Sequence, residues 1–209
     1  MTMDGILREV LSDKPFYKHS GGGVTLSGGD PLLYPEFVIE IAQHLRAENV
    51  HIAIQTSCFP KQWRTIEPLV DYIDLFIVDL KSLDTKRHSD VIKWPLDVIL
   101  RNLHNLFERN APVRIHIPVI PGFNDSPADF QAYAEFLGSN AEKVTGVDIL
   151  NFHSYGEGKY EALGRKDTYH FAGVQENQAE AVIPLVLALK ERGVPGITVG
   201  GLMGLGHPR

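Results

Sequence analysis

Short apolar runs alternate with longer amphipathic runs along this chain, and this alternation limits the fold more than any other feature. The apolar runs are rich in valine and isoleucine, which is typical of strands covered on both faces of a parallel sheet. Their centres lie about 25 to 38 residues apart, the spacing of repeated strand–helix units. The predicted strands are 23–27, 51–55, 75–80, 113–120, 146–152 and 197–199.

The runs between the strands have the period of helices with one apolar face. Ser126 followed by Pro127 predicts a helix start, because serine caps an N-terminus and proline suits the first helical turn. Pro184 lies inside the last amphipathic run and predicts a kink or a later start. The predicted helices are 4–11, 35–48, 97–108, one beginning at 127, and 178–192.

The order of one helix, five strand–helix units and a small final strand predicts a single α/β domain over residues 1–209. A closed eight-stranded barrel typically needs about 250 residues, so a partial barrel or a doubly wound sheet is expected. Hydrophobic residues make up 44% and charged residues 22%, the composition of a soluble globular protein. A net charge of −6 argues against nucleic acid as a partner, and no stretch is long and apolar enough to cross a membrane.

Cys58 is the only cysteine of the chain. This excludes an internal disulfide and any metal site with two cysteine ligands from this chain, and it fits a reducing, cytoplasmic setting. Taken alone, Cys58 is an inert thiol rather than a nucleophile, because the sequence offers no obvious histidine to pair with it.

Polar residues or glycines follow each of the first five predicted strands. The carboxyl ends of parallel strands meet at one edge of the sheet, where α/β proteins carry out their chemistry. Taken alone, Gly28-Gly29 is a tight turn and His153 a structural histidine, so the prediction of a site rests on the combination. The segments concerned are Ser27–Asp30, Gln55–Cys58, Asp79–Lys81, Arg114 and His116 with Pro121–Asp125, and Asn151–His153.

Four motifs occur in order and at consistent spacing: GGGVTLSGGDPLL at 21–33, VDLKSLD at 78–84, RIHIPVIPGFND at 114–125 and NFHSYGEGKYEALG at 151–164. Together they resemble the activating enzymes of glycyl radical enzymes, which are radical S-adenosylmethionine (SAM) proteins. The resemblance covers nearly the whole chain. It implies a partial (β/α)6 barrel with a mostly parallel sheet.

The resemblance also implies an activity for the full-length parent enzyme. Members of the family cleave SAM reductively on a [4Fe–4S] cluster and form a 5′-deoxyadenosyl radical. That radical removes a hydrogen from a backbone glycine of a partner glycyl radical enzyme such as pyruvate formate-lyase. A flavodoxin-type protein is the expected electron donor of the parent.

The glycine-rich motif implies contacts to the methionine end of SAM. Gly28, Gly29 and Asp30 match the residues that meet its amino group, although the family usually has glutamate where Asp30 stands. These residue types suit the ligand, because glycine allows close approach of the backbone and a carboxylate offsets the ammonium charge.

Three further motifs contribute the remaining SAM-binding residues. Asp79 and Lys81 match a DxK motif beside SAM, and Arg114 matches a strand arginine of the SAM site. His153 matches a histidine near the sugar and adenine of SAM. Lysine and arginine suit the SAM carboxylate because both are cationic donors.

Gln55 departs from the family, whose members often have an acidic residue there, followed by threonine and then, two positions later, by glycine. This chain has Gln55-Thr56-Ser57-Cys58 instead. In the prototype of the family the acid helps to hold a monovalent cation near the SAM carboxylate. The resemblance therefore does not extend to a cation site in this chain.

The CxxxCxxC motif that holds the family's cluster is absent, since only 20 residues precede Gly21 and none is a cysteine. We therefore expect this chain to be the C-terminal part of an activating enzyme, inactive alone and without the first barrel strand. The strand 23–27 should then be an open sheet edge, with Val24 and Leu26 on one side and Thr25 on the other. Such an edge invites self-association.

Two other functions agree with part of these observations. A non-catalytic domain could keep a SAM-like or partner-binding surface. A small barrel lyase could use Lys81 as a Schiff-base nucleophile and Asp79 as its acid and base. Only the lyase would form an adduct on Lys81 that borohydride traps in the presence of a carbonyl substrate.

Overall fold

The computed structural model describes residues 2–162, 164 and 166–200. Contacts divide the chain into two compact units, each described by itself below. The first unit contains residues 1–79 and 97–114, and the second contains 80–96 and 115–209. The organisation of residues 1–209 as a single domain stays a prediction.

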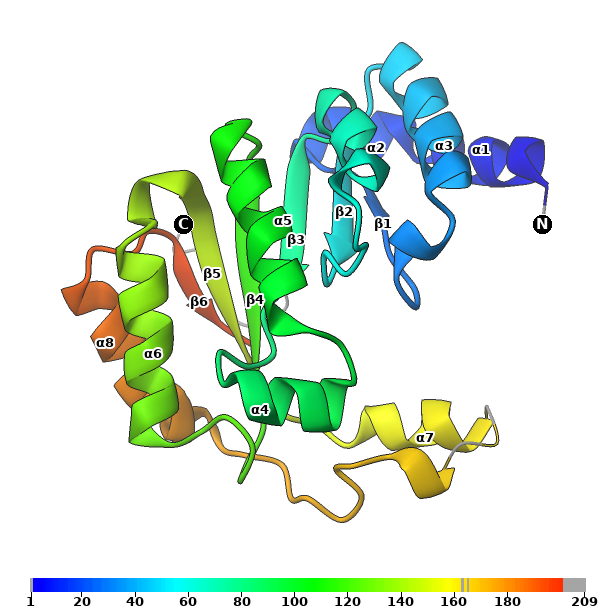
Figure 1. Ribbon diagram of the computed structural model, residues 1–209. Helices are drawn as coiled ribbons and strands as arrows, with labels where there is room; N and C mark the ends of the chain where they lie inside the picture. Colours follow the sequence, from blue (N-terminus) through cyan, green and yellow to red (C-terminus); the bar gives the residue numbers. More distant parts are fainter. Residues whose placement is uncertain (1, 163, 165, 201–209) are drawn as a thin grey trace. The chain divides into compact units, whose positions relative to one another are not determined.

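The strands of the structure lie within two residues of the predicted ones. They are β1 (Gly23–Leu26), β2 (His51–Thr56), β3 (Leu75–Asp79), β4 (Val113–Val119), β5 (Val144–Asn151) and β6 (Ile197–Val199). They follow one another in the sheet order β1-β2-β3-β4-β5-β6, so β1 and β6 stand at the two ends (Figure 1). The pairs β1–β2, β2–β3 and β5–β6 are parallel. The expected α/β class with an open parallel sheet is therefore confirmed.

All five predicted helices are present. They are α1 (Met3–Ser12), α3 (Pro35–Ala47), α5 (Leu96–Glu108), α6 (Pro127–Gly138) and α8 (Ile183–Glu191). Pro184 acts as expected, because α8 begins beside it and a 3-10 turn fills residues 179–182. The structure adds α2 (Lys14–Ser20), the single turn α4 (Thr85–Arg87) and α7 (Tyr155–Ala162), which the sequence pattern did not predict.

The second of the five expected strand–helix units is wrong. Between β2 and β3 the segment 57–74, which is described throughout, forms the 3-10 turns Trp63–Thr65 and Glu67–Asp71 and no α-helix. The segment is short, and Pro60 and Pro68 each lack a backbone donor. Two tight turns therefore return the chain to the sheet.

The core of the first unit forms where α3 packs on β2. The predicted face of α3 is buried as a whole, and each of these side chains adds roughly 1.5 to 3 kcal/mol when fully buried, less for alanine. Gly23 begins β1 opposite His51. A Cβ at Gly23 would lie 2.0 Å from the carbonyl oxygen of His51, so only glycine lets the two strands pair there. The buried residues of α3 are Val38, Ile41, Ala42 and Leu45.

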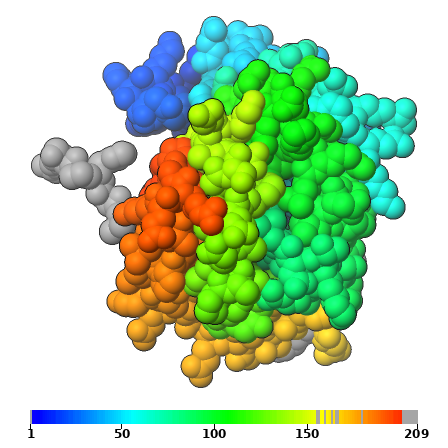
Figure 2. Space-filling view, turned by 60° about the vertical axis from the view of Figure 1, so that its left-hand side comes forward, coloured from blue at the N-terminus to red at the C-terminus, as the bar shows by residue number. Residues whose placement is uncertain are grey.

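In the second unit α6 and α8 pack side by side, as Figure 2 shows by their yellow-green and orange surfaces. The start of α6 is the predicted one. Ser126 caps it, and the side chains of Ser126 and Asp129 each accept a bond from the other's backbone amide, which forms a capping box. Among the described residues, no helix is long and apolar enough to span a membrane.

Candidate functional site

In the first unit, the turn after β1 presents its backbone to solvent. Gly28 and Gly29 are exposed and have positive φ angles of 88° and 59°. No atom lies within 4 Å of the position that a Cβ would take at either residue. The turn therefore needs glycine for its conformation, and its peptide groups are open to a ligand.

Asp30 follows these glycines, but its carboxylate turns toward the end of β2. Oδ1 accepts hydrogen bonds from the Leu32 backbone amide at 3.1 Å and from Thr56 Oγ1 at 2.8 Å. Oδ2 accepts from the backbone amide of Ser57 at 2.9 Å and from its Oγ at 2.8 Å. Asp30 thus joins the ends of β1 and β2, and a contact of its side chain with SAM stays a prediction.

The ends of β2 and β3 also meet through polar side chains. Gln55 Nε2 donates a hydrogen bond to Oδ1 of Asp79 at 3.2 Å, and both residues are half-buried. Asp79 is the last residue of β3. The carboxyl ends of β1, β2 and β3 therefore gather Gly28, Gly29, Asp30 and Asp79 in one unit, as the strand pattern predicts.

Cys58 is fully buried beside this group, which agrees with the expectation of an inert thiol. Burial raises the pKa of its thiol far above the usual value, and the nearby carboxylates of Asp30 and Asp79 raise it further. Its backbone has a positive φ of 56°, a conformation that favours glycine. The resemblance gives this position to glycine, and the backbone explains why.

Arg114 lies on β4, where buried residues alternate with half-buried ones. It shares the half-buried face with His116 and Pro118, and Val113 and Ile115 point to the buried side. Arg114 is counted with the first unit, so five of the seven predicted site residues belong there.

Lys81 and His153 belong to the second unit. Lys81 lies two residues beyond the end of β3, so strand alternation does not fix the direction of its side chain. It lines a cavity of about 350 Å³ together with Pro118, Phe152 and Phe171. His153 is exposed and follows the end of β5.

A buried polar network that contacts the backbone of Lys81 was not predicted. Asn124 Nδ2 donates to the carbonyl oxygen of Lys81 at 2.9 Å and to that of Pro118 at 2.8 Å. Asn124 Oδ1 accepts from the Ile120 amide at 2.7 Å. Asn124 therefore fixes the backbone at Lys81, and the only sequence signal was its place in the PGFND motif.

A second unpredicted pair joins β4 to β5 in the second unit. Nε2 of His116 lies 3.0 Å from Oδ2 of Asp148, which is fully buried. The hydroxyl of Thr198 on β6 donates to Oδ1 of the same carboxylate. His116 and Asp148 both lie inside apolar runs, and periodicity alone predicts only that they are strand residues.

Comparison with known sequences gives consistent matches. Residues 1–137 match the model of the radical SAM superfamily. The chain is 58% identical over 207 residues to the benzylsuccinate synthase activating enzyme of Thauera aromatica, a match that covers 99% of this chain and 62% of that protein. It is 34% identical to the pyruvate formate-lyase 2-activating enzyme of Escherichia coli strain K12, over 96% of this chain and 67% of that protein. The chain thus spans less than two thirds of the length of the Thauera aromatica protein.

A solved structure has a similar fold and a similar extent. It is a domain of pyruvate-formate lyase-activating enzyme from Bacteroides vulgatus ATCC 8482, with a TM-score of 0.71 and 28% identity. The match covers 86% of this chain and 99% of that domain.

Proposed function

Because the chain belongs to the radical SAM superfamily, and within it to the activating enzymes of glycyl radical enzymes, we propose that it binds SAM for the generation of a glycyl radical on a partner enzyme. The observation that carries this proposal is the exposed turn of Gly28 and Gly29 at the carboxyl ends of β1, β2 and β3. When bound with its cluster, SAM supplies the radical chemistry of such an oxidoreductase.

The chain's own residues bind and orient SAM. Peptide groups of Gly28 and Gly29 receive the methionine end, with Asp79 offsetting its ammonium charge. Lys81 and Arg114 attract its carboxylate, and His153 lies toward its sugar and adenine. Asp30 acts mainly through the turn, since its four hydrogen bonds hold the end of β1 against β2. These roles require the two units to act together as one domain.

The residues of this chain do not fit the [4Fe–4S] cluster. The family's cluster needs three thiolates, and the chain has one cysteine, which is buried. Among the described residues, no group of three or more histidines, cysteines, aspartates or glutamates could hold a metal ion. The proposed activity therefore needs cluster ligands that are not among these 209 residues.

For the partner, we favour a glycyl radical enzyme of the benzylsuccinate synthase type, because the relative that activates that enzyme is 58% identical. A partner of the pyruvate formate-lyase type is the alternative, at 34% identity. A flavodoxin-type protein would donate the electron. The single cysteine fits a cytoplasmic, reducing location.

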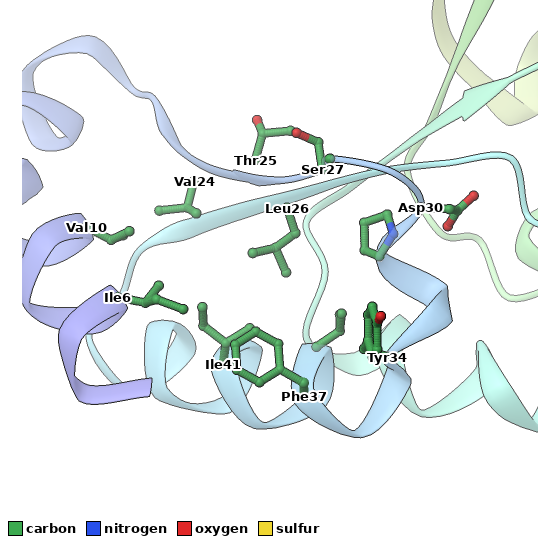
Figure 3. Close-up of a pocket in the computed structure, with 13 residues that line it drawn as sticks. Ile6, Val10, Val24, Thr25, Leu26, Ser27, Asp30, Tyr34, Phe37 and Ile41 are labelled. Atoms are coloured by element: carbon green, nitrogen blue, oxygen red, sulfur yellow. The ribbon is translucent and has the colours of Figure 1, made fainter. Parts of the chain in front are cut away.

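Self-association through the edge of β1 is a further part of the proposal. Figure 3 shows Val24 and Leu26 pointing from β1 toward α3, while Thr25 points to the opposite side. A cavity of about 320 Å³ lies beside β1, lined mostly by apolar residues of α1, β1 and α3, which include the exposed Phe37. An edge strand beside an apolar hollow favours pairing with another chain. Sedimentation that shows only monomers at high concentration would contradict this part.

Calorimetry tests the proposed SAM site. SAM should bind weakly, with a dissociation constant of roughly 0.1 to 1 mM, since the cluster that normally chelates it is absent. Lys81→Ala should weaken the binding at least several-fold. Lys86→Ala is the matched control, because Lys86 lies in the same unit and pairs on the surface with Asp90. Equal affinity of both variants and the wild type would show that Lys81 does not contact SAM.

A further inference from the structure

Two carboxylates stand at the ends of β1 and β3 beside the same buried thiol. Asp30 and Asp79 are both half-buried, and both lie near enough to Cys58 to raise its pKa, after the larger effect of burial. Carboxylates in such a setting are costly unless donors or cations compensate them. Asp30 and Asp79 could each be compensated either by neutral hydrogen-bond donors or by a cation.

Asp30 is compensated by neutral donors alone. Two backbone amides and two hydroxyls, from Leu32, Thr56 and Ser57, supply its four hydrogen bonds, all between 2.8 and 3.1 Å. These bonds occupy both carboxylate oxygens. A cation is not needed there.

Gln55 provides a neutral donor to Asp79. Its Nε2 lies 3.2 Å from Oδ1 of Asp79 and presents a hydrogen to it. With the amide turned over, Oε1 would face Oδ1, and two acceptors stay this close only with a cation or a proton between them. A glutamate at position 55 would create the same conflict with an added charge.

We infer that Gln55 is a positioning residue that holds Asp79 with an uncharged amide, so that this group of carboxylates works without a bound cation. The family's prototype uses an acid and a monovalent cation at this place. In this chain the amide donates to Oδ1 and brings no negative charge, so Gln55 and Asp79 attract a cation less strongly than two carboxylates would. The inference concerns the protein without SAM, so it stands or fails independently of the proposed function.

Thermal unfolding in different salts tests the inference. The chain and the variant Gln55→Glu are unfolded at pH 8 in KCl, NaCl and choline chloride of equal ionic strength. The wild type should show the same melting temperature in all three salts, to within about 1 °C. Gln55→Glu should melt about 4 °C lower in choline chloride and recover most of that loss in KCl or NaCl, because a small cation can then bridge the two carboxylates.

Two control variants separate this effect from a general loss of structure. Gln55→Leu removes the donor without adding charge and should melt lower by the same amount in every salt. Gln43→Glu adds the same charge at an exposed glutamine of α3 that bonds the Tyr72 hydroxyl, and it should show no difference between the salts. The melting temperature of Gln43→Glu shows how an added negative charge elsewhere in the first unit affects stability.

Either of two results would overturn the inference. One is a wild type that K⁺ or Na⁺ stabilises by several degrees over choline, which would reveal a cation site. The other is a folded Gln55→Glu whose melting temperature is the same in all three salts. If Gln55→Glu does not fold, the salt response of the wild type still decides the matter.

Discussion

Asn102 donates from its Nδ2 to the carbonyl oxygen of Cys58 at 2.8 Å, so that helix α5 holds the backbone of the one cysteine. The same amide donates to the carbonyl oxygen of Pro60 at 2.7 Å. Asn102 is fully buried, and its two bonds fix the loop that leaves β2. This clamp keeps Cys58 in a left-handed conformation, with φ at 56°.

Because of this clamp, we expect an unusual order of stability for two substitutions at position 58. Cys58→Ala removes the buried sulfur and keeps the left-handed strain, whereas Cys58→Gly removes both. In ordinary positions glycine is less stable than alanine by about 0.5 to 1 kcal/mol. At position 58 we expect Cys58→Gly to be as stable as Cys58→Ala or more stable, by up to about 1 kcal/mol. Denaturant unfolding of both variants measures this, and the ordinary ranking would show that the backbone is not held there.

The thiol of Cys58 should be unreactive in the folded protein. Burial and the two nearby carboxylates raise its pKa, so the thiolate is scarce at pH 8 and the reagent has no access. A thiol-specific disulfide reagent should label it only as fast as the chain unfolds. Rapid labelling without denaturant, at the rate of a free thiol, would contradict the burial of Cys58.

The second unit contains a charge pair whose effect on stability depends on pH. The Arg87 guanidinium donates to both oxygens of Asp129, one bond measuring 3.0 Å, and Asp129 also belongs to the capping box of α6. Burial alone would raise the pKa of Asp129, but hydrogen bonds from Arg87 and Ser126 hold it below its usual value. Because the pKa is lowered in the folded state, the charged carboxylate stabilises the protein at any pH above the unfolded pKa of about 3.9. This stabilisation is lost as the pH falls through the folded pKa.

Asp129→Asn should therefore lower the free energy of unfolding by about 1.5 to 3 kcal/mol at pH 7, because it weakens bonds to a charged donor. The difference should shrink below about pH 4, because the carboxyl of the unfolded chain then takes up a proton before the carboxyl of the folded protein does. Asp90→Asn is the control. Its pair with Lys86 is exposed, so losing it should not change the free energy of unfolding measurably. A difference that stays constant from pH 7 to pH 3 would refute the role of the charge.

Helix faces and strand positions could be predicted because they depend on local periodicity. Val38, Ile41 and Leu45 recur at helical spacing, and all three are buried on α3. Ser126-Pro127 begins α6 as the capping chemistry requires. The gathering of Asp30 and Asp79 also followed from the sequence, since both stand at the carboxyl ends of apolar runs that form β1 and β3, and both strands pair in parallel with β2.

The direction of single polar side chains could not be predicted from the same pattern. Asp30 turns to Thr56 and Ser57, 26 and 27 positions later, and Arg87 meets Asp129 at a separation of 42 residues. Such bonds depend on the tertiary path of loops, for which periodicity carries no signal. The π-helical turn His88–Ile92, which is followed by the left-handed Lys93, was also not predicted.

Iron binding tests whether this chain can hold a cluster. The protein, reconstituted with iron and sulfide without oxygen, should retain no stoichiometric [4Fe–4S] cluster, since one buried cysteine cannot replace three thiolates. Iron analysis and the visible spectrum measure this. A stable cubane spectrum with about four irons per chain would contradict the assignment, provided that sedimentation shows the loaded protein to be a monomer.

In the proposed site SAM contacts the backbone of the Gly28–Gly29 turn, and amide NMR spectra test this contact. On addition of SAM to roughly millimolar concentration, the amide signals of Gly28 and Gly29 should shift progressively and saturate. The signal of Gly138, at the end of α6 against the Arg192 side chain, should stay in place. A spectrum in which other residues shift while Gly28 and Gly29 do not, or in which nothing shifts, would contradict the claim.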